Sequence, residues 1–353
     1  MSYKSGFKAE NISTHYDWSE WGRFSDEVEL CNNDGACRKL DYGVMCQSYR
    51  VTKEEKDLVR GRANTLRLAL SNQLPEGSFA SKGMYETMEL CVSCKACQRE
   101  CPMSVDMAKM KSEFLSHYYK KFSMSIKDKV ISEMPKLIWL LKISNPIINV
   151  LNKLPVFSQI IEWFGFSSKR SLPVVENQNP LKEIYNSQPS LSKKVILFAD
   201  TFNINFEIKN LMYAIKVLNK FGYQAVIPSY QNDNLDRPLC CGRTYISLGQ
   251  LDKAKKELER FSKYMIENNY HELPVVGIEP SCLLTFNDEF KSFSNLNGRD
   301  KIKNEFFLLE EFLLNEIKNG NKVKPKEFDK NVLIHGHCHQ KSQNRTKGLT
   351  GLL

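Results

Sequence analysis

Four cysteines between positions 91 and 101 have the side chains and the spacing needed to hold iron. The run is Cys91, Cys94, Cys97 and Cys101, followed by Pro102. The pattern C-x2-C-x2-C-x3-C-P is typical of bacterial ferredoxins, in which three cysteines ligate one [4Fe–4S] cluster and the fourth ligates another. A structural zinc site more often has two separated C-x2-C pairs or a mixture of Cys and His. The run therefore predicts an iron–sulfur cluster, with zinc or unliganded thiols as the alternatives.

A second group of three thiols precedes this run. It consists of Cys31, Cys37 and Cys46, and Gly35 and Gly43 stand between them. Glycine allows the tight backbone turns that wrapping a cluster requires. Since free cysteine also packs as a small apolar residue, buried structural cysteines are the alternative. Beside the complete motif downstream, this group predicts further ligands.

The seven thiols are one short of the eight that two cubes need. If the last cysteine of each group reaches across, one cluster takes three thiols from the second group and one from the first. Its ligands are then Cys91, Cys94, Cys97 and Cys46. The thiols left over are Cys31, Cys37 and Cys101. They would hold a second cluster with Asp34 or Asp41 as a further ligand, or Cys101 alone closes the first. The sequence predicts one cluster and leaves the second open.

Composition and charge limit the class of protein. The 353 residues with 42% hydrophobic content are enough for two domains. The net charge of +9 is spread along the chain, which favours a solvated surface and no nucleic-acid partner. An odd number of cysteines and a polar start without an apolar leader favour the cytoplasm. Peripheral attachment to the inner face of a membrane remains an alternative.

The elements around the thiols are predicted to be helical. Residues 1–30, with Trp18 and Trp21, form an extended lead-in without clear periodicity. A capping-box pattern at Thr52 and Glu55 predicts a helix from Lys53 to Leu70, with Leu58, Leu66 and Leu70 on its apolar side. Arg60, Arg62 and Arg67 on this helix are interpreted as solvated. A further helix over Val105–Tyr119 places both cysteine groups in loops between helices.

Residues 126–173 are strongly apolar and aromatic. A spanning helix needs ~20 uninterrupted apolar residues. Pro135, Lys142, Pro146, Lys153 and Pro155 divide this region into shorter pieces. Core helices that link two domains are therefore expected, and a patch on a membrane surface is the alternative. Residues 167–192 are polar, contain three prolines and predict a linker.

A βαβ pattern begins at Lys193. The strands Val195–Ala199 and Gln224–Pro228 flank a helix over Phe206–Phe221, which predicts a parallel sheet. Two further strands, Val275–Ile278 and Val332–Ile334, each run into a cysteine loop.

Soft metal donors collect in the predicted loops of this region. They are Cys240, Cys241, Cys282 and Cys338, with His335, His337 and His339. Such a donor set suits iron and predicts a second redox site. A zinc site and a redox-inert remnant are the alternatives.

Two sets of segments resemble a known family. CNNDGACRKLDYGVMCQSYRVTKEE, RGRANTLRLAL and LCVSCKACQRECPMSVDMAKMKSEFL resemble the iron–sulfur part of FAD-linked 2-hydroxyacid dehydrogenases of the glycolate oxidase, D-lactate and D-2-hydroxyglutarate type. RPLCCGR, VVGIEPSCLL and HGHCHQK resemble the cysteine-rich CCG domain of the same enzymes and of heterodisulfide reductase. One departure is Gln47, where the family commonly has proline.

The resemblance implies a mixed fold class. An α-helical ferredoxin domain over 31–125 is followed by a helical connector and linker over 126–192. An α/β CCG domain with parallel βαβ units then occupies 193–353. The family has a second CCG triplet after the HGHCHQK segment, and Ser342–Leu353 contain no cysteine. The resemblance therefore implies an incomplete second repeat and a compromised C-terminal redox site.

The implied function is electron transfer. The chain has no glycine-rich dinucleotide loop after a predicted strand, so FAD is expected only on a partner, an FAD-binding 2-hydroxyacid dehydrogenase subunit. Electrons would pass from that flavin through the clusters to a quinone or another carrier. This makes the chain an oxidoreductase component that is not expected to oxidise substrate alone. The rival hypotheses are a thiol/disulfide redox protein like heterodisulfide reductase, an inactive remnant of a fused dehydrogenase, and a non-redox protein that binds zinc or nucleic acid.

Overall fold

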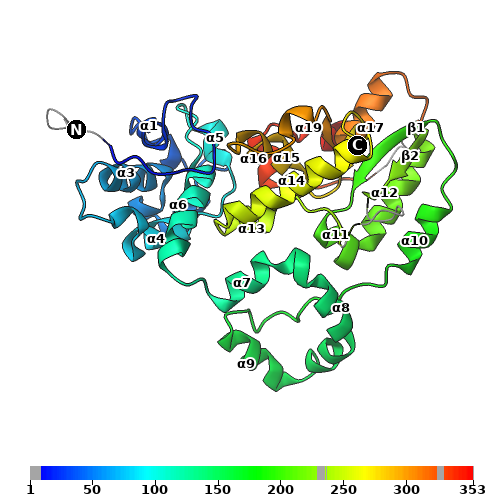
Figure 1. Ribbon diagram of the computed structural model, residues 1–353, viewed down its shortest axis with the longest axis horizontal. Coiled ribbons are helices and arrows are strands. Elements are labelled where there is room, and N and C mark those ends of the chain that lie inside the picture. Colours follow the sequence, from blue (N-terminus) through cyan, green and yellow to red (C-terminus); the bar gives the residue numbers. More distant parts are fainter. Residues whose placement is uncertain (1–8, 229–234, 236, 324–329, 353) are drawn as a thin grey trace.

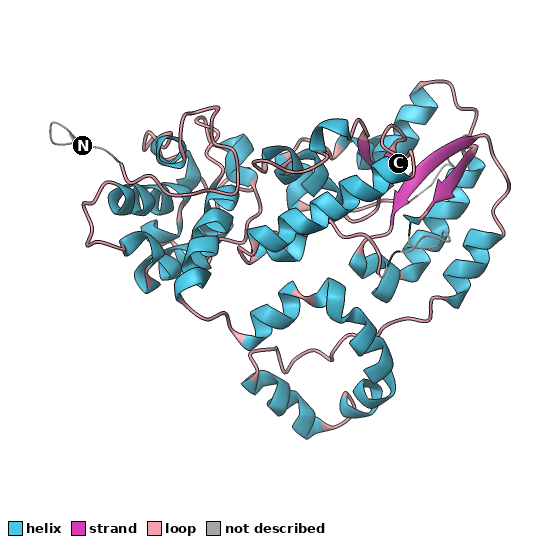
Figure 2. Ribbon diagram, in the orientation of Figure 1, coloured by secondary structure: helices cyan, strands magenta, loops and turns pink. Residues whose placement is uncertain are grey.

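The protein folds as a group of short helices, a protruding helical arm and a parallel sheet with its covering helices (Figure 1). The computed structural model describes residues 9–228, 235, 237–323 and 330–352. Helices predominate, and one four-stranded sheet lies in the C-terminal half (Figure 2). The predicted mixed fold class is confirmed at this level.

The N-terminal helices are short and pack around buried apolar side chains. Their bounds are α1 Phe24–Glu29, η1 Ala36–Arg38, α2 Gln47–Thr52, η2 Glu55–Asp57, α3 Val59–Leu70, η3 Ser78–Ala80, α4 Lys82–Glu89, α5 Ala96–Glu100 and α6 Met107–Lys121. Leu58, Leu66 and Leu70 are buried. Their spacings of eight and four residues place them on one side of a helix, as predicted. Because most of these helices have only one or two turns, tertiary packing must provide most of their stability.

The predicted helix from Lys53 is wrong at its start. Thr52 ends α2, where its hydroxyl donates to the Ser48 carbonyl. Glu55 lies in η2 and pairs with Arg60 instead of capping a helix. The helix begins only at Val59, so the capping-box pattern marks a turn between two helices.

The lead-in crosses from the N-terminal helices to the sheet region. The Tyr16 ring is buried against Phe293 with ring centroids 4.7 Å apart, and the two residues form an antiparallel bridge. The buried carboxylate of Glu113 accepts hydrogen bonds from the backbone amides of His15 and Tyr16 at 3.0 and 3.2 Å. The contacts of this segment fix the two regions against each other. The predicted extended lead-in over residues 1–30 is wrong at its end, because residues 19–23 form turns and α1 follows, and residues 1–8 lie outside the described residues.

Glu27 of α1 gives a pH-dependent contribution to stability. Burial raises the pKa of its carboxyl to about 7. The folded state therefore binds this proton more tightly than the unfolded state, and stability is lost as the pH rises from about 4.5 through 7. We expect Glu27→Gln to raise the denaturant midpoint at pH 8 and to leave it nearly unchanged at pH 5. Glu20→Gln on the exposed turn before α1 is the control, and an equal effect of both substitutions would contradict the prediction.

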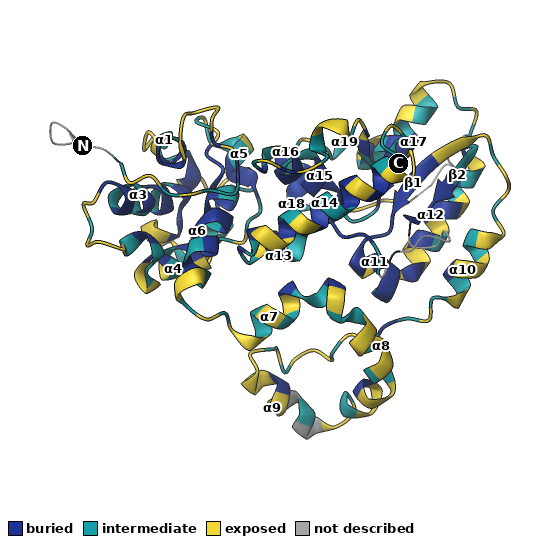
Figure 3. Cartoon of the chain, viewed as in Figure 1, coloured by how far each residue is buried: buried dark blue, intermediate teal, exposed yellow. Residues whose placement is uncertain are grey.

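The apolar region forms an arm rather than the expected core helices. Its helices are α7 Ile126–Ser132, α8 Met134–Leu151 and α9 Pro155–Trp163, and α10 Asn179–Asn186 lies within the predicted linker. Only Pro135 and Ile148 of α8 are buried (Figure 3). Among the described residues, we find no helix that combines the length and apolar character needed to cross a bilayer.

The parallel sheet has the strand order β2-β1-β3-β4. The strands are β1 Lys193–Phe198, β2 Tyr223–Val226, β3 Val275–Gly277 and β4 Phe306–Leu308. The three predicted strands before residue 300 are confirmed, and β4 was not predicted. Val332–Ile334 is not a strand but exposed irregular chain, in which Leu333 is 98% exposed. Among the described residues no strand pairs with this apolar run, and the strand that borders β3 opposite β1 is β4.

The helices of this region cover both faces of the sheet. They are α11 Thr201–Phe206, α12 Ile208–Lys220, α13 Arg243–Ser247, α14 Leu251–Glu267, α15 Pro280–Asn287, α16 Glu289–Ser292, η5 Arg299–Lys301, α17 Leu309–Lys318, α18 Cys338–Ser342 and α19 Lys347–Leu352. Ile196 and Phe198 of β1 point into a core that continues into the N-terminal helices. Val195 and Leu197 point into a separate core with α12. The alternation along β1 thus places a helical layer on each face.

Candidate metal centre

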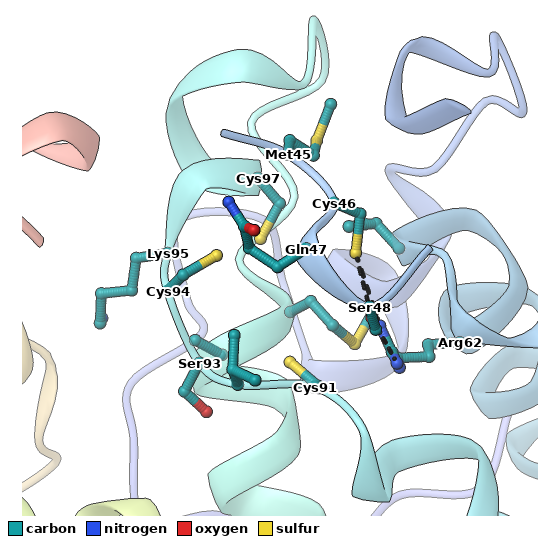
Figure 4. A pocket seen from close by; sticks show the side chains of 14 residues that line it. Met45, Cys46, Gln47, Ser48, Arg62, Cys91, Ser93, Cys94, Lys95 and Cys97 are labelled. Carbon is teal, nitrogen blue, oxygen red and sulfur yellow. Dashed lines mark hydrogen bonds between the residues drawn. The ribbon is translucent and has the colours of Figure 1, made fainter. Parts of the chain in front are cut away.

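Four of the predicted thiols line one small pocket in the N-terminal region. They are Cys46, Cys91, Cys94 and Cys97. Figure 4 shows their sulfurs directed into the same space, which Met45, Gln47 and Lys95 also border. The structure thus brings the last thiol of the first group to the first three of the second. That these thiols ligate a cluster stays a prediction.

Short turns between helices position these thiols. Cys46 precedes the first residue of α2, and Cys91 follows α4. Ser93 and Lys95 have φ values of 52° and 59°, in the left-handed region that non-glycine residues seldom adopt. The two reversals wrap the chain around the pocket before α5 begins with Ala96. Such strain is typical of functional loops.

Burial raises the pKa values of two of these thiols. That of Cys94 rises to about 12, and that of the fully buried Cys97 is also raised. Both side chains are therefore neutral in the absence of a bound cation, which deprotonates a coordinating thiol. Among the described residues, no three His, Cys, Asp or Glu side chains are arranged to hold a metal ion. In a [4Fe–4S] cube each thiolate binds a different iron, so its ligands do not converge on a single metal ion.

Cationic side chains surround the pocket, which suits a negatively charged cluster. Arg62 is fully buried and its Nη1 lies 3.7 Å from the Cys46 sulfur. Lys111 Nζ donates to the Cys91 carbonyl at 2.6 Å. The donor set and these charges fit a [4Fe–4S] cluster.

Arg62 was interpreted as solvated, and the structure corrects this interpretation. Its guanidinium donates to the Thr87 carbonyl at 2.9 Å and to the Ser48 hydroxyl at 3.0 Å, and lies 3.8 Å from the buried Asp57 carboxylate. The sequence contained a signal for this. Arg62 is four residues from both Leu58 and Leu66, so it occupies the apolar stripe of α3.

The remaining three thiols of the two groups lie near one another. They are Cys31, Cys37 and Cys101, of which only Cys37 is buried. Burial raises the pKa of Cys31, and the charge of Cys101 raises it further.

The loop before Cys46 is fixed by Glu100, which accepts hydrogen bonds from the amides of Val44 and Met45 at 2.8 Å. Gly43 is required here because its φ is 78° and a Cβ would lie 2.5 Å from the Glu100 carboxylate. The candidate carboxylates Asp34 and Asp41 are exposed on the same loop region.

Three thiols of the predicted second redox site come together in the sheet region. Cys240, Cys241 and Cys282 are buried, and the Cys241 thiol interacts with both others. The amides of Gly242 and Arg243 donate to the sulfurs of Cys240 and Cys241 at 3.4 Å. The pKa of each of the three thiols is raised. Neutral thiols of this kind are poor nucleophiles.

The fourth thiol and the histidines lie toward the N-terminal pocket. Cys338 begins α18, and its charge contributes to the raised pKa of Cys94. His339 Nε2 lies 3.1 Å from the Ser93 carbonyl, and burial with the charges of Arg243 and Lys95 lowers its pKa to about 3. His337 accepts a hydrogen bond from the His339 amide, whereas His335 is exposed. The HGHCHQK segment therefore contacts the first thiol site.

A buried ion network connects the two thiol sites, and sequence reasoning missed it. Lys95 Nζ lies 2.5 Å from Asp288, 3.0 Å from Glu289 and 3.7 Å from Asp106. Glu289 in turn accepts two hydrogen bonds from Arg243 at 2.7 and 2.9 Å.

The charge state of the network follows from these pairs. Burial lowers the pKa of Lys95, but the three carboxylates raise it well above its usual value. Burial raises the pKa of Glu289, but Arg243 and Lys95 lower it below its usual range. No local pattern reveals such pairs, since their members are distant in sequence.

Comparisons with known proteins support an iron–sulfur domain in the N-terminal region. Residues 26–105 match the family model of a 4Fe-4S dicluster domain. The chain is 23% identical to the D-2-hydroxyglutarate dehydrogenase of Pantoea ananatis, over 80% of this chain and 33% of that protein. It is 23% identical to that of Pseudomonas putida, over 91% and 35%, and 21% identical to that of Escherichia coli, over 74% and 30%. No solved structure gives a significant match.

These matches confirm the predicted resemblance. The chain spans about a third of the length of the curated relatives that it matches. Its N-terminal helical region carries the iron–sulfur motif, and the similarity extends across the sheet region.

Proposed function

We propose that this chain, which resembles the iron–sulfur part of FAD-linked 2-hydroxyacid dehydrogenases, relays electrons from a flavin partner to a quinone or another carrier. The observation that carries this proposal is the convergence of four thiols on one buried pocket within the residues that match a dicluster domain. FAD belongs to the partner, an FAD-binding 2-hydroxyacid dehydrogenase subunit. Because the similar proteins are D-2-hydroxyglutarate dehydrogenases, D-2-hydroxyglutarate is the first substrate to test with the partner.

The residues of the pocket have distinct roles in this proposal. Cys46, Cys91, Cys94 and Cys97 ligate a [4Fe–4S] cluster, which when bound supplies one-electron transfer. Arg62 and Lys111 place positive charge beside the ligands and so favour the more negative, reduced state.

The division of the chain follows the same proposal. A ferredoxin-type domain spans 31–125, a connector spans 126–192 and a CCG domain begins at 193. The proposal includes this one cluster and leaves a second open. Cys31, Cys37 and Cys101 would hold a second cluster with Asp34 or Asp41 as a further ligand, or Cys101 alone would close the first. The buried Cys240, Cys241 and Cys282 are ligands of a C-terminal redox site.

Anaerobic purification tests the proposal directly. The protein should be brown, with broad visible absorption that bleaches on addition of dithionite. Addition of an FAD-dependent 2-hydroxyacid dehydrogenase with its substrate should bleach the same absorption. A colourless protein loaded with zinc would refute the relay, and turnover of a disulfide without a flavoprotein would favour the thiol enzyme. The neutral state of the buried thiols argues against that rival.

Cys46→Ser tests the assignment of ligands across the two groups. If Cys46 closes the main cluster, its loss should remove most of the electron paramagnetic resonance signal of the reduced main cluster. Cys101→Ser is the matched control, because Cys101 is absent from the pocket lining and should leave that signal in place. The reverse result would show that the second cysteine group binds the cluster alone.

A further inference from the structure

The helical arm has an apolar face that the rest of the chain leaves open. Trp139, Ile143, Ile147, Val150 and Leu154 are between 51% and 68% exposed. Their spacing of three or four residues places them on one side of α8 and its extension. On α9, Trp163 is 84% exposed, and Ile160 and Phe164 beside it are 49% and 40% exposed. Contiguous patches of this kind mark interaction sites in monomeric proteins.

The opposite face of α8 and the base of the arm already have partners. The Asn145 side chain exchanges two hydrogen bonds with the backbone of Val175, and Asn152 does the same with Leu172. At the base, Glu133 accepts a hydrogen bond from the Tyr245 hydroxyl at 2.8 Å and pairs with Lys253. These contacts fix the arm to α13 and α14. The arm protrudes from the rest of the chain (Figure 1). Trp139 at its near end also borders Asn205 and Pro238 of the sheet region.

The charge around this face is positive. Residues 126–170 contain seven Lys or Arg and three Asp or Glu, a net charge of +4. One of the three carboxylates is Glu133, which faces the protein body. Within α8 itself, Lys136 and Lys142 are exposed and no carboxylate is present. A second copy of the chain would bring two such positive faces together, which is unfavourable.

We propose that the face formed by α8 and α9 binds the surface of a membrane that contains acidic phospholipids. Exposed aliphatic and tryptophan side chains enter the interface, while lysine stems extend along the surface to the lipid phosphates. The arm lies on the bilayer and does not cross it. This proposal rests on the arm alone, so it stands whether or not the electron relay does.

Flotation of the full-length protein with vesicles tests this proposal. Vesicles of phosphatidylcholine with phosphatidylglycerol should carry the protein, and vesicles of phosphatidylcholine alone should carry much less. Ile143→Glu with Ile147→Glu should weaken binding by more than about a hundredfold, because two apolar contacts are replaced by anionic groups. Tyr213→Glu, at an exposed position on α12, is the control and should bind like the unaltered protein. Iron content and circular dichroism establish that each variant is folded.

Three results would overturn the proposal. The first is an unaltered protein that fails to float with acidic vesicles. The second is an unchanged affinity of the double variant. The third is a double variant that loses only self-association in light scattering, or only co-purification with a flavoprotein. In that case the face binds a protein and not a membrane. Quenching of Trp139 and Trp163 fluorescence by brominated lipid would support insertion, and Trp139→Phe with Trp163→Phe should abolish the quenching.

Discussion

Cys94→Ser is expected to remove most of the iron from the purified protein. An alcohol is a poor ligand for an iron–sulfur cube, which requires thiolate donors. Cys94 lies at the centre of the run and lines the pocket together with three other thiols. The loss should appear in iron and acid-labile sulfide analysis and in the visible spectrum, with at most a small fraction of the unaltered absorbance remaining.

Cys282→Ser is the matched control for this substitution. Cys282 is buried among the thiols of the sheet region, away from the first pocket. Its variant should keep the spectrum of the N-terminal cluster and lose only a signal that belongs to the second site. If Cys94→Ser left the iron content unchanged, the pocket would not be the metal centre.

Lys95→Met is expected to cause the largest loss of stability of any single substitution outside the cysteines. It leaves Asp288 and Asp106 buried without their cation, although Glu289 keeps Arg243. Removal of one partner from a buried ion pair typically costs about 3–5 kcal/mol. The denaturant midpoint of the variant should fall accordingly, and limited proteolysis should detect separation of the N-terminal helices from the sheet region.

Two further variants separate charge from packing at this site. Lys95→Met combined with Asp288→Asn should recover part of the lost stability, since fewer buried charges remain unpaired. Lys256→Met, at an exposed position on α14, should change the midpoint by less than about 0.5 kcal/mol. An equal loss in the single and double variants would show that the pairing with Asp288 contributes nothing.

The sequence was informative wherever a local pattern determined the structure. Cysteine spacing identified the four thiols that line the pocket, and short apolar runs identified β1, β2 and β3. Val332–Ile334 has the same apolar character as those strands, but whether such a run pairs depends on tertiary contacts that no local pattern encodes. For the same reason, the three-residue strand β4 was missed.

Charged residues were the main failure of sequence reasoning. Arg62 was expected in solvent and Lys95 was given no role, because buried charges are rare, yet each is buried with carboxylate or thiol partners. The partners Asp288 and Glu289 are far from Lys95 in the chain, so only the folded structure reveals them. The opposite error occurred at α8. Its apolar sequence predicted buried core helices, but most of its apolar side chains are exposed or half-buried.

The lead-in has a consequence for how the protein is made on the ribosome. Residues 15–17 leave the ribosome long before residues 292–294, yet Asp17 donates its amide hydrogen bond to the Ser292 carbonyl, and the Ser294 amide donates to the carbonyl of His15. These contacts therefore cannot form until residues 292–294 have been translated. During that interval Glu113 lacks the backbone amides of His15 and Tyr16, and the edge of the N-terminal helices stays uncovered. The N-terminal helices and the sheet region thus become joined through the lead-in only late in the synthesis of these residues.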